Sequence, residues 1–258
     1  WSKNRKEEIR SKIADNYAKK LDDKKKKLWK SLWEEAGENN KDGENKKRIK
    51  VPKNKPKKKS KENIDILFAK ACENGDDFEL GHILAVNNSI DVNKADKDGW
   101  TPLNIACEKG NTGIVNVLLG LDNIDVNKAN DYGQTPLYIA CDNNKTDIVE
   151  ALLDINNIDV NKVDKYGKTP LYNVCKEGYL GKKSYLGVVE LLLTHEKIEV
   201  NKTNKEGETP LLVACLKGHT EIVKALLDIN NIDVNKDNNS KATPLYYACQ
   251  KNNTDIVQ

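Results

Sequence analysis

The side chains best suited to chemistry in this sequence are six cysteines, which recur at intervals of 35, 34, 34, 40 and 34 residues. Thiolates bind zinc when ligands lie a few residues apart, and no such cysteine pair occurs. Equivalent positions in packed helices lie roughly 10 Å apart, which is farther than a disulfide spans. We therefore predict buried, reduced thiols, no metal and no cofactor, which is typical of an intracellular protein. The cysteines are Cys72, Cys107, Cys141, Cys175, Cys215 and Cys249.

Three histidines are the other candidates for acid–base chemistry, and they lie far apart at His82, His195 and His219. The sequence contains no phosphate-binding glycine loop and no arrangement typical of a Ser-His-Asp triad. We interpret the histidines as surface or packing residues. The sequence predicts no catalytic residues, so we expect that the protein is not an enzyme.

The cysteine spacing belongs to a repeated unit, because Thr-Pro-Leu recurs at steps of 34, 34, 40 and 34 residues. In the unit at 96–127, Thr101 and Pro102 have the residue types preferred at a helix start. Gly110 ends that helix, and a second helix follows Thr112. No single unit could bury both apolar faces, so the units must stack. The copies begin at Thr101, Thr135, Thr169, Thr209 and Thr243.

The repeated pattern Gly-x-Thr-Pro-Leu-x-x-Ala, then Gly, Ile-Val-x-x-Leu-Leu and Asp-Val-Asn, resembles the ankyrin repeat family. The resemblance covers residues 62–258, as six units of which the last is incomplete. It implies an all-α solenoid of helix–turn–helix units joined by β-hairpin loops, present as a monomeric array. It also implies a non-catalytic scaffold that binds another protein on its concave face.

Several departures from the family pattern can be tested. The unit at 62–95 lacks Thr-Pro-Leu and resembles an N-terminal capping unit. Lys241 replaces the hairpin glycine, which puts the last hairpin in doubt. The final unit stops at Gln258 inside its second helix, so we expect further repeats or a cap beyond it. The histidine usual in the family after Thr-Pro-Leu is replaced, so its usual hydrogen bond cannot be assumed. The residues found there are Asn104, Tyr138, Tyr172, Leu212 and Tyr246.

The 40-residue step places six extra residues near 179–186, between two helices. This insertion is either a neutral surface loop or a contact loop that presents Tyr179 and Tyr185.

The resemblance places the partner-binding residues on the hairpin tips and on the exposed side of each first helix. Trp100, Tyr132 and Tyr166 stand out, because the packing of the repeat does not require an aromatic side chain there. The predicted contact residues are Lys97, Asp98, Trp100, Glu108 and Lys109; Asp131, Tyr132, Gln134, Asp142 and Asn143; Lys165, Tyr166, Lys168, Lys176 and Glu177; and Lys205, Glu206, Glu208, Leu216 and Lys217.

The first 60 residues form a basic arm, with 22 Lys/Arg against 10 Asp/Glu (+12), whereas the remaining 21 basic and 30 acidic residues give −9. Residues 1–36 carry an apolar stripe compatible with a helix, and they faintly resemble parts of an HMG box, a DNA-bending family. Residues 37–61 read as a disordered, lysine-rich linker. Two basic clusters in this linker are typical of a nuclear-import signal or a nucleic-acid-binding tail. They are Lys46, Lys47 and Arg48, and Lys57, Lys58 and Lys59.

Three functional hypotheses stay open. The chain is a protein-binding scaffold, a nuclear protein whose arm binds nucleic acid while its repeats recruit a partner, or the regulatory array of a larger enzyme or membrane protein. The arm could also dock on the acidic repeats of its own chain. The sequence begins at Trp1 and has no methionine, so we expect it to be a fragment. It contains no apolar run long enough to span a membrane, and we expect a cytoplasmic or nuclear location.

Overall fold

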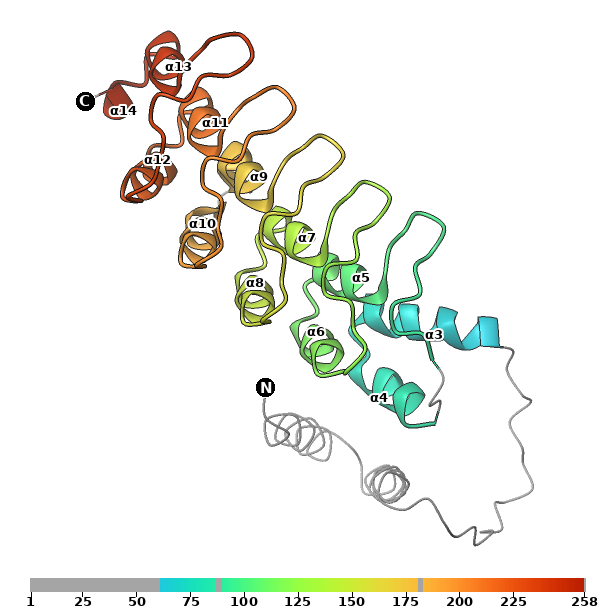
Figure 1. Cartoon of the computed structure of the whole chain (residues 1–258). Helices are drawn as coiled ribbons and strands as arrows, with labels where there is room; N and C mark the ends of the chain where they lie inside the picture. Colours follow the sequence, from blue (N-terminus) through green and yellow to red (C-terminus); the bar gives the residue numbers. More distant parts are fainter. Residues whose placement is uncertain (1–60, 87–89, 181–182, 258) are drawn as a thin grey trace, which may run out of the picture.

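The computed structural model describes residues 61–86, 90–180 and 183–257, and in this part the chain is a stack of helix pairs. The first helices of the pairs form one row, the second helices form a parallel row, and the loops between units project beyond the first row (Figure 1). The predicted helical solenoid is confirmed. The first helices are α3 (Lys61–Asn74), α5 (Pro102–Lys109), α7 (Pro136–Asp142), α9 (Pro170–Glu177), α11 (Pro210–Lys217) and α13 (Pro244–Gln250). The second helices are α4 (Asp77–Val86), α6 (Thr112–Leu119), α8 (Thr146–Leu153), α10 (Leu186–Leu193), α12 (Thr220–Leu227) and α14 (Thr254–Val257).

The Thr-Pro step starts each of the five first helices from α5 onward. The threonine hydroxyl accepts a hydrogen bond from the backbone N–H three residues later, at 3.0–3.2 Å. Proline follows at the first helical position, where no N–H is needed. This threonine bond uses a backbone donor, so it forms at Asn104, Tyr138 and Leu212 alike and does not depend on the histidine that the sequence lacks.

A single core of buried side chains runs through all the units. The leucine of Thr-Pro-Leu is almost fully buried in the inner units, with 0% exposure at Leu103, Leu137 and Leu171 and 2% at Leu211. All six cysteines are free thiols, and five of them are buried as predicted. The predicted burial is wrong for Cys249, which is exposed because no helix pair among the described residues covers its face of α13. Burial of the inner cysteines disfavours the thiolate, so the pKa of every inner thiol is raised, for example to about 12 at Cys72.

Each hairpin tip is held by one aspartate or asparagine. Its side-chain oxygen accepts two backbone N–H bonds, from the second and fourth residues after it, at 2.8–3.0 Å. These bonds close the turn locally. The five residues are Asp96, Asn130, Asp164, Asn204 and Asn238.

The last hairpin forms despite Lys241, so the doubt that the sequence raised about it is wrong. Lys241 adopts φ 64°, close to the φ of 77–80° that glycine has in the other four tips. A non-glycine residue pays about 1–2 kcal/mol for this conformation. Three hydrogen bonds of Asn238 offset that cost. Its Oδ1 accepts from two backbone N–H groups, and its own backbone N–H donates to the Ala242 carbonyl.

A ladder of asparagines ties the outer ends of the units together. The asparagine of Asp/Glu-Val-Asn donates its Nδ2 to a carbonyl of the next unit at 2.6–2.7 Å. Its Oδ1 accepts a backbone N–H from that next unit at 2.8–2.9 Å. The recurrent Asn therefore satisfies backbone groups that the loop leaves free. The ladder residues are Asn93, Asn127, Asn161 and Asn201.

The insertion contains two antiparallel strands of two residues each, β1 (Tyr179–Leu180) and β2 (Lys183–Ser184). Tyr185 follows β2 and is buried, with 1% of its side chain exposed, and its hydroxyl donates to the Asp142 carbonyl. The hypothesis that Tyr185 is a surface contact residue is therefore wrong. The reason is that Tyr185 is the N-cap residue of α10 and its side chain packs in the core between two units.

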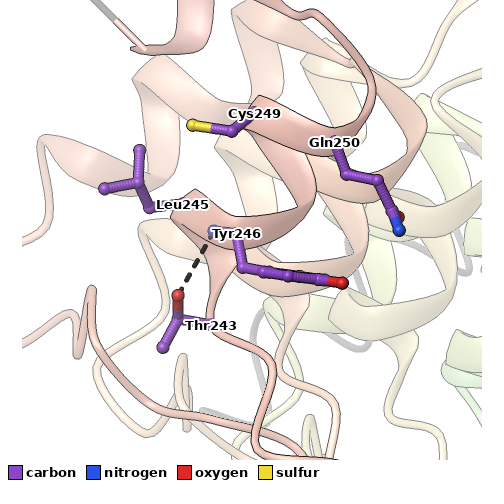
Figure 2. A pocket seen from close by; sticks show the side chains of 5 residues that line it. All are labelled: Thr243, Leu245, Tyr246, Cys249 and Gln250. Carbon is purple, nitrogen blue, oxygen red and sulfur yellow. Dashed lines mark hydrogen bonds between the residues drawn. The ribbon is translucent and has the colours of Figure 1, made fainter.

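The last unit exposes positions that are buried in the inner units. Leu245 is 56% exposed and Tyr246 is 54% exposed. With Thr243, Cys249 and Gln250 they line a shallow hollow on α13 (Figure 2). In the inner units the following helix pair covers the corresponding residues. The N-terminal unit exposes both the charged Lys70 and the apolar Ile66 on α3, the latter at 50%, so its role as a capping unit stays a prediction.

We predict that Leu171→Ala destabilises the protein by about 2–5 kcal/mol, because it leaves a cavity between two units. The same change at the equivalent Leu245 removes an exposed side chain and should cost less than about 1 kcal/mol. Urea unfolding followed by circular dichroism measures both. Equal losses would show that the last unit is covered like the inner ones.

We also predict that a water-soluble disulfide reagent modifies one thiol of the native protein quickly, and all six after unfolding. Cys249 reacts because it is exposed, whereas the inner thiols are inaccessible and their raised pKa values disfavour the thiolate. The reaction is followed by absorbance near neutral pH. A Cys249→Ser variant should lose the fast phase, and a fast phase that survives would contradict the assigned burial.

Candidate functional site

The hairpin tips form a continuous strip, because each tip is hydrogen-bonded to the next. In each bond the N–H of the first tip residue donates to the carbonyl of the second tip residue of the preceding hairpin, at 3.0–3.2 Å. These four bonds hold the tips in register, and the side chains of both tip positions lie in rows along the array. We call this surface the hairpin strip. Its first positions are Lys97, Asp131, Lys165, Lys205 and Asn239, and its second positions are Asp98, Tyr132, Tyr166, Glu206 and Ser240.

Two tyrosines dominate the centre of the hairpin strip. Tyr132 is 56% exposed and Tyr166 is 61% exposed, on consecutive hairpins. Lys168 places its Nζ 5.1 Å from the Tyr166 ring centroid, which is a cation–π distance. Trp100 is different, since it is partly buried and packs against the core. Part of its role is therefore structural, and the two tyrosines are the free aromatic groups of the strip.

The other predicted contact residues divide into exposed groups and groups with internal partners. Lys97, Asp98, Asp131, Lys165, Lys205, Glu206 and Lys217 are exposed, and Leu216 is partly exposed. On the first helices, Glu108 pairs with Lys109 at 3.2 Å and Lys176 pairs with Glu177 at 2.7 Å. Asp142, Gln134 and Glu208 each accept a hydrogen bond from a side-chain amide of another residue. The side-chain amide of Asn143 donates to the Ile139 carbonyl.

Two buried tyrosines provide inter-unit bonds that the sequence did not reveal. Tyr138 donates its hydroxyl to Asp164 Oδ2 at 3.1 Å, and Tyr172 donates to Glu208 Oε2 at 2.6 Å. Each reaches from a first helix to the following hairpin. The only sequence signal was the substitution of the usual histidine. Tyrosine replaces it with a longer side chain that bonds to the next unit.

The pKa values of both tyrosines are raised, first because burial disfavours the phenolate and then because the neighbouring carboxylates repel it. A group whose pKa is higher in the folded state than in the unfolded state adds to the free energy of unfolding at low pH, and this contribution is lost as the pH rises. Here the loss begins near pH 10, the ordinary phenol pKa.

The histidines do not converge on a site. His219 Nε2 lies 3.2 Å from the Lys176 carbonyl of the preceding unit, and burial lowers its pKa. Within the described ranges, no group of three or more His, Cys, Asp or Glu side chains is placed to hold a metal ion. No helix among the described residues is long and apolar enough to cross a bilayer.

The predictions for the basic arm fall outside the described residues. They concern the possible helix and HMG-like segment in 1–36, and the basic clusters Lys46, Lys47 and Arg48, and Lys57, Lys58 and Lys59. Tyr179 lies in β1, at the start of the inserted hairpin.

Comparison with known proteins identifies the repeat. The family model described as ankyrin repeats (3 copies) matches residues 35–130, 67–164, 121–186 and 180–258. The chain belongs to the ankyrin repeat family. Ankyrin repeats are a protein–protein interaction module, and the fold is typically non-catalytic.

Individual relatives agree with this assignment at the level of the repeat. The crystal structure of EF0377, an ankyrin repeat protein, is similar with a TM-score of 0.66 and 28% identity, over 74% of this chain and 95% of that one. Segments of alpha-latrotoxins from Latrodectus geometricus and Latrodectus tredecimguttatus are 36% identical over 53 residues. These segments cover 20% of this ankyrin chain but only 4% of each toxin.

We predict that Tyr172→Phe lowers the free energy of unfolding by about 1–2 kcal/mol, because it removes a hydrogen bond to a carboxylate. Tyr246→Phe is the matched control, since the Tyr246 ring is exposed on α13 and the change should be close to neutral. Chemical denaturation at several pH values measures both. The advantage of the wild-type protein over Tyr172→Phe should be complete below pH about 10 and shrink above it; a constant difference up to pH about 11 would contradict this role.

Proposed function

We propose that this ankyrin array is a non-catalytic scaffold that binds a protein partner through the hairpin strip and the adjoining side of the first helices. In the family this is the concave side. The observation that carries the proposal is the pair of exposed tyrosines, Tyr132 and Tyr166, on consecutive hydrogen-bonded tips. Aromatic rings on a rigid backbone lose little conformational entropy on binding, and they are the commonest interface hot spots.

The rigidity of the tips supports the same proposal. Each tip is held within its own unit by an aspartate or asparagine and to its neighbour by a backbone bond. A partner would therefore meet a surface that is already ordered, which lowers the cost of association. The proposal includes an intracellular location, cytoplasmic or nuclear, and six free thiols support it.

The test is a double variant, Tyr132→Ala with Tyr166→Ala. Partners captured by the full chain are identified by mass spectrometry, and their affinities are then measured by calorimetry. We expect the double variant to lose at least about 2 kcal/mol of binding free energy, a loss of roughly 30-fold. Both side chains are exposed, so the free energy of unfolding of the double variant should be nearly that of the wild-type protein.

Tyr246→Ala is the matched control, because its ring is about as exposed as those of the strip but lies on α13, outside the hairpin strip. It should bind the partner as the wild-type protein does. Undiminished binding by the tyrosine double variant would refute the assigned surface.

A further inference from the structure

Three lysines lie on the two neighbouring hairpins at and next to the tip that carries Tyr166. Lys165 precedes it, and Lys168 places its Nζ 5.1 Å from the ring centroid. Lys205 belongs to the next hairpin, where its N–H donates to the Tyr166 carbonyl at 3.2 Å. The Cγ of Lys205 lies 3.2 Å from the position a Cβ would take at Gly167. The lysine stem therefore lies against the tip that carries Tyr166, and the absence of a side chain at Gly167 makes room for it.

These three ammonium groups have no ion-pair partner among the described residues. Two carboxylates of these hairpins, Asp164 and Glu208, have internal roles, whereas Glu206 beside Lys205 is exposed. Asp164 accepts two backbone N–H bonds and the Tyr138 hydroxyl, and Glu208 accepts bonds from Tyr172 and Asn204.

The cluster is opposite in sign to the domain that carries it. Residues 61–258 hold 21 basic and 30 acidic side chains, so most of this surface repels an acidic ligand. Positive charge gathered on one part of the strip would orient such a ligand on approach.

We propose that the hairpin strip binds an acidic segment of a partner protein, with carboxylates on Lys165, Lys168 and Lys205 and an apolar side chain on Tyr132 and Tyr166. This inference rests on the proposed function and adds the chemistry of the partner. The strip offers two kinds of contact side by side, lysines for carboxylates and two rings for an apolar group. An acidic segment that carries both can use them together.

The flanking charges favour a peptide over a nucleic acid. Asp131 and Glu206 are exposed at tip positions on the two sides of the cluster. A continuous phosphate backbone would bring negative charge against both carboxylates. A peptide can place its carboxylates at the lysines alone and uncharged residues beside Asp131 and Glu206.

The experiment uses a fluorescent peptide of about twelve residues, long enough to span neighbouring hairpins, in which glutamates alternate with leucine and tryptophan. A second peptide has lysine in place of every glutamate. Anisotropy titrations compare three full-length proteins. They are the wild type; the strip variant Lys165→Glu, Lys168→Glu and Lys205→Glu; and a control variant Lys70→Glu, Lys197→Glu and Lys224→Glu, whose lysines are exposed elsewhere.

Residues 1–60 attract acidic peptides in all three proteins, so the decisive quantity is the difference between the two variants, whose net charges are equal. We expect the strip variant to bind the acidic peptide at least ~10-fold more weakly than the control variant does. The control variant should stay within roughly threefold of the wild type. A photo-cross-linking form of the acidic peptide should label the hairpins of Tyr132 and Tyr166.

Equal losses in the two variants would overturn the proposal, as would equal binding of the lysine peptide by the wild-type protein. If a single-stranded oligonucleotide depends on the three lysines while the acidic peptide does not, the partner class is wrong. Binding of the captured protein partners to both variants distinguishes a wrong ligand class from a wrong proposed function. Loss of the partner in the tyrosine double variant but not in the strip variant would leave the scaffold standing and refute only the acidic ligand.

Discussion

Every unit of this protein depends on its neighbour, because one helix pair cannot bury the apolar faces of both its helices. The leucine of Thr-Pro-Leu shows this dependence directly. It is fully buried at Leu171, where another unit follows, and 56% exposed at Leu245 on α13. The residue type and the local helix are the same in both places. The difference in burial comes from the covering unit alone, and at about 25 cal/mol per Å² of apolar surface that covering supplies most of the stability of such an array.

Polar bonds between units add direction to this apolar contact. The asparagine ladder joins the outer loops, Tyr138 and Tyr172 join first helices to the following hairpins, and backbone bonds join the tips. Each bond connects atoms that only correct stacking brings together, so the bonds specify register more than they add stability. The same register orders the hairpin strip. Binding residues can therefore vary at the tips while the positions beneath them stay constant.

The sequence allowed the architecture to be predicted closely, because the repeat imposes the same solution on every unit. Helix starts at threonine, helix ends at glycine or asparagine, and the burial of the inner cysteines all follow from local chemistry and periodicity. Three interpretations failed or were incomplete where a residue departed from the repeat. Lys241 forms its hairpin because Asn238 holds the turn, Tyr185 turns inward, and Trp100 is half in the core. In each case the deciding contact lies outside the residue itself.

What the sequence determined by itself was the repeat: the period, the caps, the positions that must be buried and the family to which they belong. It could not decide where side chains at the variable positions would point. Tyr132, Tyr138, Tyr166, Tyr172 and Tyr185 are the same residue type, yet two are exposed and three are buried. Only the stacked structure separates them, because the burial of a side chain is set by the neighbouring unit, whose residues lie some 30 to 40 positions away in the chain. The placement of Lys205 against the tip that carries Tyr166 is decided in the same way, by two hairpins that meet only when the units are packed.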